Sequence, residues 1–204
     1  MAAAVDRDAD EHRAKMIRIK AAKDRLYAGK TQEKGLLIVH TGTGKGKSTA
    51  AWGLAMRCLG HGLKLGVVQF VKGRSVPGER KLLECFPELV TIRVMGQGFT
   101  WETQDRAQDI AAARAAFEEA KLMLRDPELH LVILDELNIV LRYDTLPLRE
   151  VIDALAARRP GLHVVVTGRN AKPELIEAAD LVTEMKLVKH PFRQGIKGQL
   201  GVEF

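Results

Sequence analysis

A stretch rich in glycine and lysine, residues 42–49, constrains the fold more than any other part of the chain. It follows an apolar run and precedes an amphipathic one. A strand, a glycine-rich turn and a helix in this order are typical of a phosphate-binding loop, because glycines let backbone N–H groups approach phosphate oxygens and the helix adds its positive dipole end. We predict that this loop binds ATP through Gly42, Thr43, Gly44, Lys45, Gly46, Lys47, Ser48 and Thr49.

Two of these residues have specific expected roles. Lys47 reaches the terminal phosphates, and the Ser48 hydroxyl holds Mg²⁺ or Mn²⁺. The loop departs from the usual pattern G-x-x-x-x-G-K-[ST], because the chain has Thr41 where the pattern has its first glycine. Lys45 adds a second cation.

A second signal is the sequence L-V-I-L-D-E at residues 131–136. Its apolar residues describe a buried strand, and the strand delivers Asp135 and Glu136 at its carboxyl end. In proteins with a phosphate-binding loop, an acid at this place holds the metal directly or through water. The acid pair is weakly specific alone, but its combination with the loop strongly indicates nucleoside triphosphate binding. Either acid could be the metal ligand.

Strand and helix patterns alternate after residue 34. The predicted strands cover residues 36–40, 65–71, 90–95, 131–134, 163–167 and 181–188, and the predicted helices cover 49–59, 104–124, 147–158 and a short segment from Pro173. This alternation predicts an α/β fold, a doubly wound and mostly parallel sheet with helices on both faces, of the P-loop NTPase-like (RecA-like) type. We expect residues 1–34 to form a basic helix and joint, and residues 35–204 to form the catalytic domain.

Composition sets further bounds on the 204-residue chain. No apolar run approaches the roughly 20 residues that span a bilayer, and the N-terminus lacks the apolar core of a signal peptide. We therefore expect a cytoplasmic protein without a membrane partner. The net charge of +6 suits an anionic ligand. We see no basic strand surface carrying aromatic residues, so nucleic acid is not an expected partner.

Three segments each allow two interpretations. Residues 12–26 predict an amphipathic helix, either with a solvated basic face or packed against a partner subunit. Arg169 follows a predicted strand and either neutralises phosphate or lies on the surface. The loop G-Q-G-F-T-W-E-T at residues 96–103 contains Phe99 and Trp101, which either anchor the loop to the core or face a flat apolar ligand. Spacing alone favours the core for this pair.

Taken together, these motifs resemble the ATP:corrinoid adenosyltransferases of vitamin B12 synthesis and salvage. The resemblance rests on the phosphate-binding loop, the G-F-T-W-E-T loop, the L-D-E-L strand end, T-G-R at residues 167–169, and the closing H-P-F-R-Q-G-I-K-G-Q-L-G-V-E-F. It spans nearly the whole chain, and family members resemble it in having Thr-Gly in place of the first glycine.

The resemblance implies a reaction and a set of partners. A Co(I) corrinoid attacks the 5′ carbon of ATP, which lies reversed relative to ordinary P-loop enzymes, and inorganic triphosphate leaves. Phe99 and Trp101 would exclude the axial ligand of Co(II) and so ease its reduction, which makes them catalytic residues together with Lys47. The family also implies a homodimer in which the N-terminal helix closes over the neighbouring site. A flavin protein is the expected electron donor.

Two other functions compete with this one. A P-loop ATPase or kinase would release ADP, and the aromatic loop argues against it. A non-catalytic module that binds nucleotide or nucleic acid would show salt-dependent binding without turnover.

Overall fold

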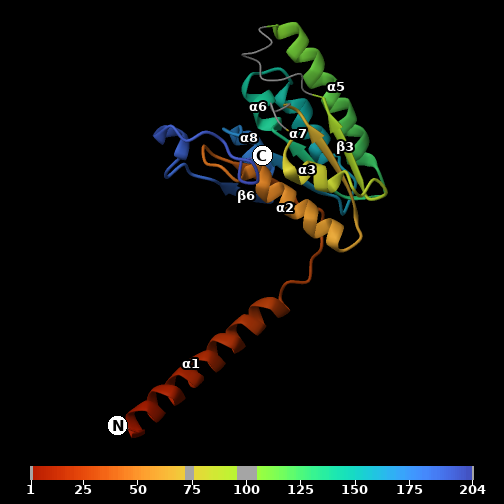
Figure 1. The fold of residues 1–204 in the computed structure, drawn as a ribbon. Helices are drawn as coiled ribbons and strands as arrows, with labels where there is room; N and C mark the ends of the chain where they lie inside the picture. The colour runs from red at the N-terminus through yellow and green to blue at the C-terminus, as the bar shows by residue number, and fades with distance from the viewer. Residues whose placement is uncertain (1, 72–75, 96–104, 204) are drawn as a thin grey trace. The chain divides into compact units, whose positions relative to one another are not determined.

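The computed structural model of the chain describes residues 2–71, 76–95 and 105–203 (Figure 1). The chain divides into two compact units, Met1–Glu33 and Lys34–Phe204. The first unit contains one helix, α1 (Ala2–Ala28), which is longer than the predicted 12–26. Apolar side chains along α1 are exposed, namely Met16, Ile17, Ile19, Leu26 and Tyr27.

Among the described residues, the second unit is built on a six-stranded sheet. Its strands are β1 (Leu37–Thr41), β2 (Lys64–Gln69), β3 (Val90–Val94), β4 (Leu129–Asp135), β5 (His163–Thr167) and β6 (Leu181–Glu184). They lie in the order β3-β2-β4-β5-β1-β6, and every pair of neighbours is parallel. The predicted α/β class with a parallel sheet is confirmed.

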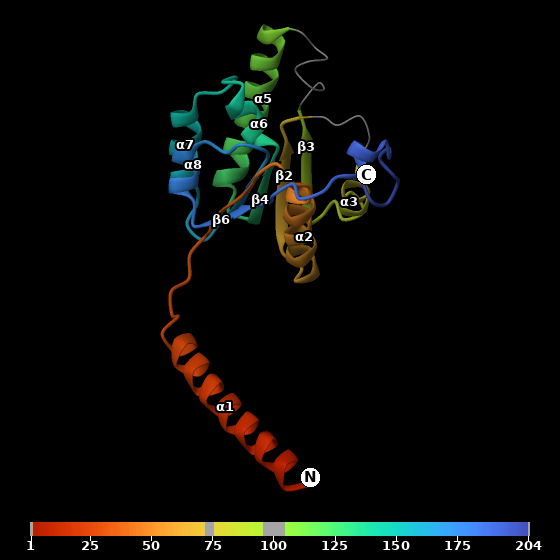
Figure 2. The same ribbon diagram turned by 90° about the vertical axis from the view of Figure 1, so that its left-hand side faces the viewer.

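Helices cover both faces of this sheet (Figure 2). One face packs against α2 (Lys47–Gly60) and α3 (Gly78–Leu83) around the buried Trp52. The other packs against α5 (Arg106–Arg125), α6 (Leu137–Arg142), α7 (Leu148–Ala156) and α8 (Pro173–Ala178) around the buried Phe117. Because β1, β4 and β5 carry apolar residues toward both layers, their sequences are nearly continuous apolar runs.

Besides the longer α1 and shifts of one or two residues at the ends of elements, the structure differs from the expected elements in two further respects. The helices α3 and α6 were not predicted, because each has only six residues and is too short to display a helical period. The last strand ends at Glu184 instead of residue 188. Its partner β1 ends at Thr41, which pairs with Glu184, so the chain beyond has no strand to pair with there.

The strand order decides where functional side chains meet. Since β5 lies between β1 and β4, the carboxyl ends of these three strands are neighbours at one edge of the sheet. Ligands of open α/β sheets bind at such an edge. No described helix is both long and apolar enough to cross a membrane.

Two glycines outside this edge test the packing. A Cβ added to the buried Gly35 would lie 2.2 Å from the Leu162 carbonyl oxygen, whereas one added to the exposed Gly53 of α2 would meet nothing within 4 Å. We expect Gly35→Ala to lower the free energy of unfolding by about 1–3 kcal/mol, because backbone must move. Gly53→Ala should raise it by about 0.5–1 kcal/mol, because alanine is the better helix former.

Urea unfolding of both variants beside the wild type measures this difference. A Gly35→Ala variant as stable as the wild type would contradict the close packing of the chain just before β1 against the Leu162 backbone.

Candidate active site

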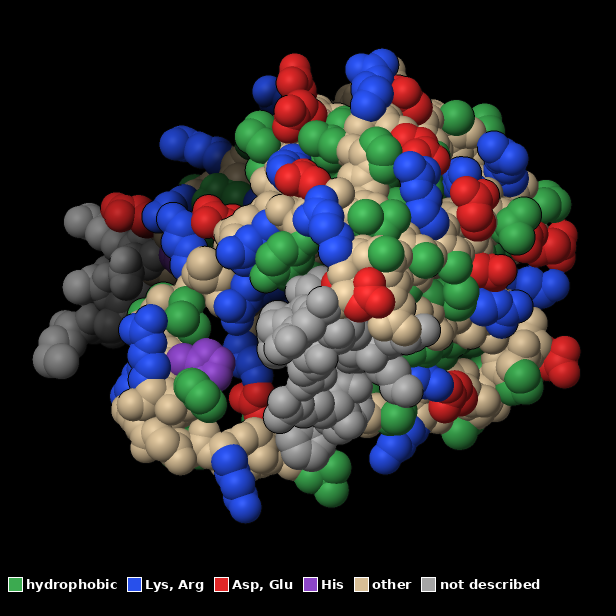
Figure 3. All heavy atoms as spheres, turned by 90° about the horizontal axis from the view of Figure 1, so that it is seen from above, with side chains coloured by type: hydrophobic (Ala, Val, Ile, Leu, Met, Phe, Trp, Pro, Cys, Tyr) green, Lys and Arg blue, Asp and Glu red, His purple; other side chains and the backbone are tan. Residues whose placement is uncertain are grey.

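The phosphate-binding loop connects β1 to α2 and forms one wall of a pocket of about 640 Å³. Gly46 precedes α2 with φ 100°, and no side chain caps the first N–H groups of the helix. The positive end of the helix therefore faces an anion-binding space. Lys and Arg side chains gather around a hollow on the face of the molecule in Figure 3.

The chain after β6 packs directly on this loop. The Met185 N–H donates to the Thr41 carbonyl (2.9 Å), and the Gly44 N–H donates to the Met185 carbonyl (2.6 Å). A Cβ at Gly42 would lie 2.4 Å from the Met185 oxygen, and one at Gly44 2.7 Å from it. Both positions therefore require glycine because of the crossing chain, and the Gly44 N–H is already engaged within the protein.

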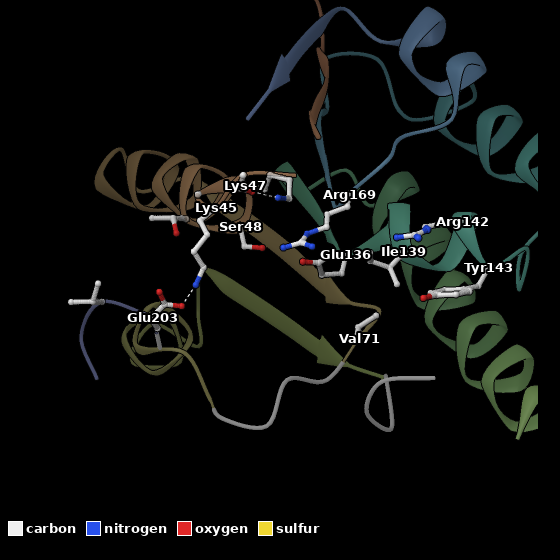
Figure 4. Close-up of a pocket in the computed structure, with 14 residues that line it drawn as sticks. Lys45, Lys47, Ser48, Val71, Glu136, Ile139, Arg142, Tyr143, Arg169 and Glu203 are labelled. Carbon is white, nitrogen blue, oxygen red and sulfur yellow. Dashed lines mark hydrogen bonds and ion pairs between the residues drawn. The ribbon is translucent and has the colours of Figure 1, made fainter. Parts of the chain in front are cut away.

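Two lysines of the loop project into the pocket. Lys47 is 7% exposed and donates to the Gly44 carbonyl. Burial lowers the pKa of Lys47, the Glu136 charge opposes that shift, and the charges of Arg169 and Lys45 add to it. Lys45 forms an ion pair with Glu203, near the end of the chain, as Figure 4 shows. A phosphate that binds Lys45 must therefore compete with a carboxylate of the protein.

The two adjacent acids after β4 have different surroundings. Asp135 is 5% exposed, and both of its oxygens accept hydrogen bonds, from the Thr167 hydroxyl (2.8 Å) and from Gln69 Nε2 (3.2 Å). It does not line the pocket. Glu136 does line it, and the buried Glu136 Oε2 has no hydrogen-bond partner among the described residues.

The backbone turns Glu136 into the pocket. Its φ is 61°, in the left-handed region, and its N–H donates to the Thr167 hydroxyl (2.9 Å). Burial raises the pKa of Glu136 to about 7, with a further rise from Asp135 and opposition from Lys47 and Arg169. A buried carboxylate with an unpaired oxygen beside cations is ready to bind a cation or to hold a proton.

Arg169 follows β5 and lines the same pocket. In Figure 4, Ser48, Glu136 and Arg169 converge on one space. The described residues contain no cluster of three or more His, Cys, Asp or Glu that could hold a metal. Ser48 and Glu136 nevertheless suit Mg²⁺, which keeps several waters and uses one or two protein oxygens together with substrate phosphates.

The pocket thus brings together most of the predicted residues. Those that line it are Gly44, Lys45, Gly46, Lys47, Ser48, Thr49, Glu136 and Arg169. Gly42 and Thr43 lie in the loop but not in the lining, and Asp135 lies behind Glu136. Phe99 and Trp101 fall outside the described residues.

Several lining residues were not predicted from the sequence. They are Val71, Ile139, Arg142, Tyr143, Val202 and Glu203. Ile139, Arg142 and Tyr143 follow the acid pair by less than two helical turns. That proximity was the available sequence signal for a place in the pocket. Val202 and Glu203 carry no such signal, because an irregular tail brings them to the pocket.

Comparison with known proteins identifies the family. The model described as "ATP:corrinoid adenosyltransferase BtuR/CobO/CobP" matches residues 33–204. A corrinoid adenosyltransferase of Sinorhizobium sp is 53% identical over 204 residues, covering 99% of this chain and 95% of that protein. One from Pseudomonas aeruginosa is 55% identical over 193 residues, covering 95% of each.

A third relative, the corrinoid adenosyltransferase CobA of Salmonella typhimurium, is 46% identical over 195 residues, covering 96% of this chain and 98% of that protein. With matches of this extent, the chain belongs to the ATP:corrinoid adenosyltransferase family and is an enzyme of that type.

Proposed function

We propose that this enzyme transfers the 5′-deoxyadenosyl group of ATP to the Co(I) of a corrinoid and releases inorganic triphosphate. The observation that carries the proposal is the convergence of Lys45, Lys47 and Arg169 with the N-terminus of α2 in one pocket of a member of this family. These groups suit a triphosphate, and we propose a P-loop NTPase-like fold for residues 35–204.

The bond changes require no base. The cobalt electron pair forms the Co–C bond, the C5′–O bond breaks, and its electron pair leaves on the triphosphate. Negative charge therefore grows on the oxygen that leaves, and fixed positive groups lower the barrier most when they already point there. Lys47 is held in place by the Gly44 carbonyl, which supports this role. ATP lies reversed in this proposal, with its ribose carbon exposed to the corrinoid.

We propose that Ser48 and Glu136 hold Mg²⁺ or Mn²⁺ and that Asp135 positions Glu136. The unpaired Glu136 oxygen supports the first assignment, and the two hydrogen bonds that occupy Asp135 support the second. When bound, the metal neutralises charge on the departing triphosphate.

We further propose a cytoplasmic homodimer in which α1 closes over the neighbouring site. The exposed apolar residues of α1 support a helix that packs on another chain. A flavin protein would supply the electron, and Phe99 and Trp101 would exclude the axial ligand of Co(II).

Product analysis tests the reaction. With ATP, Mg²⁺ and chemically reduced corrinoid, we expect triphosphate and a light-sensitive adenosylated corrinoid, whereas ADP and phosphate would contradict the proposal. Lys47→Ala should lower kcat/KM by at least about 100-fold, because a preorganised charge at the leaving group is lost. Lys81→Ala, on the exposed surface of α3, is the matched control and should be fully active.

The role of the aromatic loop is tested by changing the oxidation state of the cobalt in the corrinoid that is supplied. Trp101→Ala should lose activity when the assay starts from Co(II) and a weak reductant, and retain it with preformed Co(I). The Co(I) assay is the internal control for folding and ATP binding. Equal losses in the two assays would exclude a role in removing the axial ligand.

The assignment of Glu136 predicts a pH dependence of stability without nucleotide or metal. Its folded-state pKa of about 7 lies above the ordinary glutamate value of 4.5, so its favourable contribution to stability is present below about pH 4.5 and is lost as the pH rises through 7. Glu136→Gln should therefore exceed the wild type in free energy of unfolding at pH 8, by up to about 3 kcal/mol, and match it near pH 4.5.

Urea unfolding at the two pH values measures this, with the exposed Glu177→Gln of α8 as control. A difference between Glu136→Gln and the wild type that does not change with pH would show that Glu136 is not a buried titrating acid.

A further inference from the structure

The chain leaving β5 makes a short turn, residues 168–171, which we call the arginine turn because it carries Arg169 to the pocket (Figure 4). Gly168 has φ 124° and Asn170 has φ 56°, so two of its four residues adopt left-handed conformations. Backbone of this kind keeps a single conformation only where its surroundings hold it. The direction of Arg169 therefore depends on what the turn is attached to.

Two side chains from distant segments hold the arginine turn. The Asn138 amide, in α6, donates to the Gly168 carbonyl (3.0 Å). The Thr41 hydroxyl, at the end of β1, accepts the N–H of Ala171 (3.0 Å). Asn138 is 1% exposed and Thr41 is 6% exposed, so both bonds are shielded from water. They bracket Arg169 on the turn.

The Arg169 side chain has no comparable support of its own. Among the described residues, no hydrogen bond or ion pair fixes its guanidinium. Burial lowers the pKa of Lys45, and the charge of Arg169 lowers it further, so these two cations repel each other. A long side chain also gains conformational entropy in solvent. Because both effects favour an arginine that points away, the backbone of the turn must keep it in the pocket.

The Thr41 bond gives a physical reason for the departure of the phosphate-binding loop from the usual pattern. The pattern has glycine at this place, and glycine has no side chain that could accept the Ala171 N–H. The two segments leave the sheet as neighbours, since His40 of β1 pairs with Thr167 of β5. Threonine therefore joins the start of the loop to the arginine turn.

We propose that Thr41 and Asn138 are positioning residues, which hold the arginine turn and so keep the Arg169 guanidinium aimed at the triphosphate. The inference rests on the proposed function, in which triphosphate is the leaving group. Neither residue lines the pocket, so each acts through Arg169. Loss of either bond leaves the turn held at one point, and the cation is then less well placed where negative charge develops.

Substitutions that keep the size of the side chain test the two bonds in the full chain, with ATP, Mg²⁺ and chemically prepared cob(I)alamin. Thr41→Val and Asn138→Leu should each lower kcat/KM for ATP by about 10- to 100-fold, because a charge misplaced by about 1 Å stabilises the leaving group poorly. Thr41→Ser keeps the hydroxyl and should stay within about twofold of the wild type. The KM for the corrinoid should be unchanged in all three.

Thr145→Val is the matched control. Thr145 is 7% exposed, and its hydroxyl donates to the Val140 carbonyl (3.0 Å), outside the arginine turn. This variant also loses a buried hydroxyl bond, so its urea-unfolding midpoint should fall much as that of Thr41→Val does, while its kcat/KM should match the wild type. A loss of activity in Thr145→Val as large as in Thr41→Val would assign both losses to stability and overturn the proposal.

A double-mutant cycle tests whether the two residues act through Arg169. In an Arg169→Ala background, Thr41→Val and Asn138→Leu should change kcat/KM by less than about twofold, because the group that they position is gone. Losses as large as in the wild-type background would overturn the proposal, and so would full activity of the single variants. If Asn138→Leu does not fold, the contrast between Thr41→Val and Thr41→Ser decides.

Two further outcomes separate this proposal from the proposed function. An Arg169→Ala variant as active as the wild type would overturn the role of Arg169 and with it the positioning role. A wild type that does not adenosylate cob(I)alamin would overturn the proposed function itself.

Discussion

The hydroxyl of Thr167 joins two strands of the sheet and decides which of two adjacent acids faces the pocket. It donates to Asp135 at the end of β4 and accepts the N–H of Glu136. These two bonds hold Asp135 inward and fix the left-handed turn that sends the next side chain outward. Gln69 from β2 completes the arrangement from the other side. This hydroxyl therefore engages Asp135, whereas Glu136 Oε2 has no hydrogen-bond partner among the described residues.

The same edge of the sheet explains the unusual phosphate-binding loop. Two of its glycines face the backbone of Met185, which crosses the loop after β6 has ended. Side chains at Gly42 and Gly44 would collide with that crossing chain, whatever ligand is bound. The alternation of glycines therefore reflects packing within the protein as well as the approach of phosphate. Further along, the tail brings Glu203 to Lys45, so the end of the chain belongs to the pocket.

Most of the fold could be predicted from the sequence because its signals are local. Apolar runs buried on both faces marked the strands, and glycines between a strand and a helix marked the loop. The helices α3 and α6 escaped prediction because six residues make less than two turns. Because α6 was not predicted, three residues in or next to it that line the pocket were not predicted either, namely Ile139, Arg142 and Tyr143. The places of Val202 and Glu203 in the pocket were not predicted, because they depend on the path of an irregular tail, which no local pattern records.

The sequence by itself determined the chemical kinds of group that meet at the carboxyl ends of the strands: a lysine loop, an acid pair and an arginine. It did so because residue type and position after a strand suffice to place a side chain at that edge. Only the tertiary structure decided that Glu136, and not Asp135, lines the pocket, and that Arg142, which has no ion-pair partner among the described residues, lines it as well. Those outcomes depend on hydrogen bonds and ion pairs between segments distant in the chain, such as Thr167 with Asp135, which adjacent residues cannot encode.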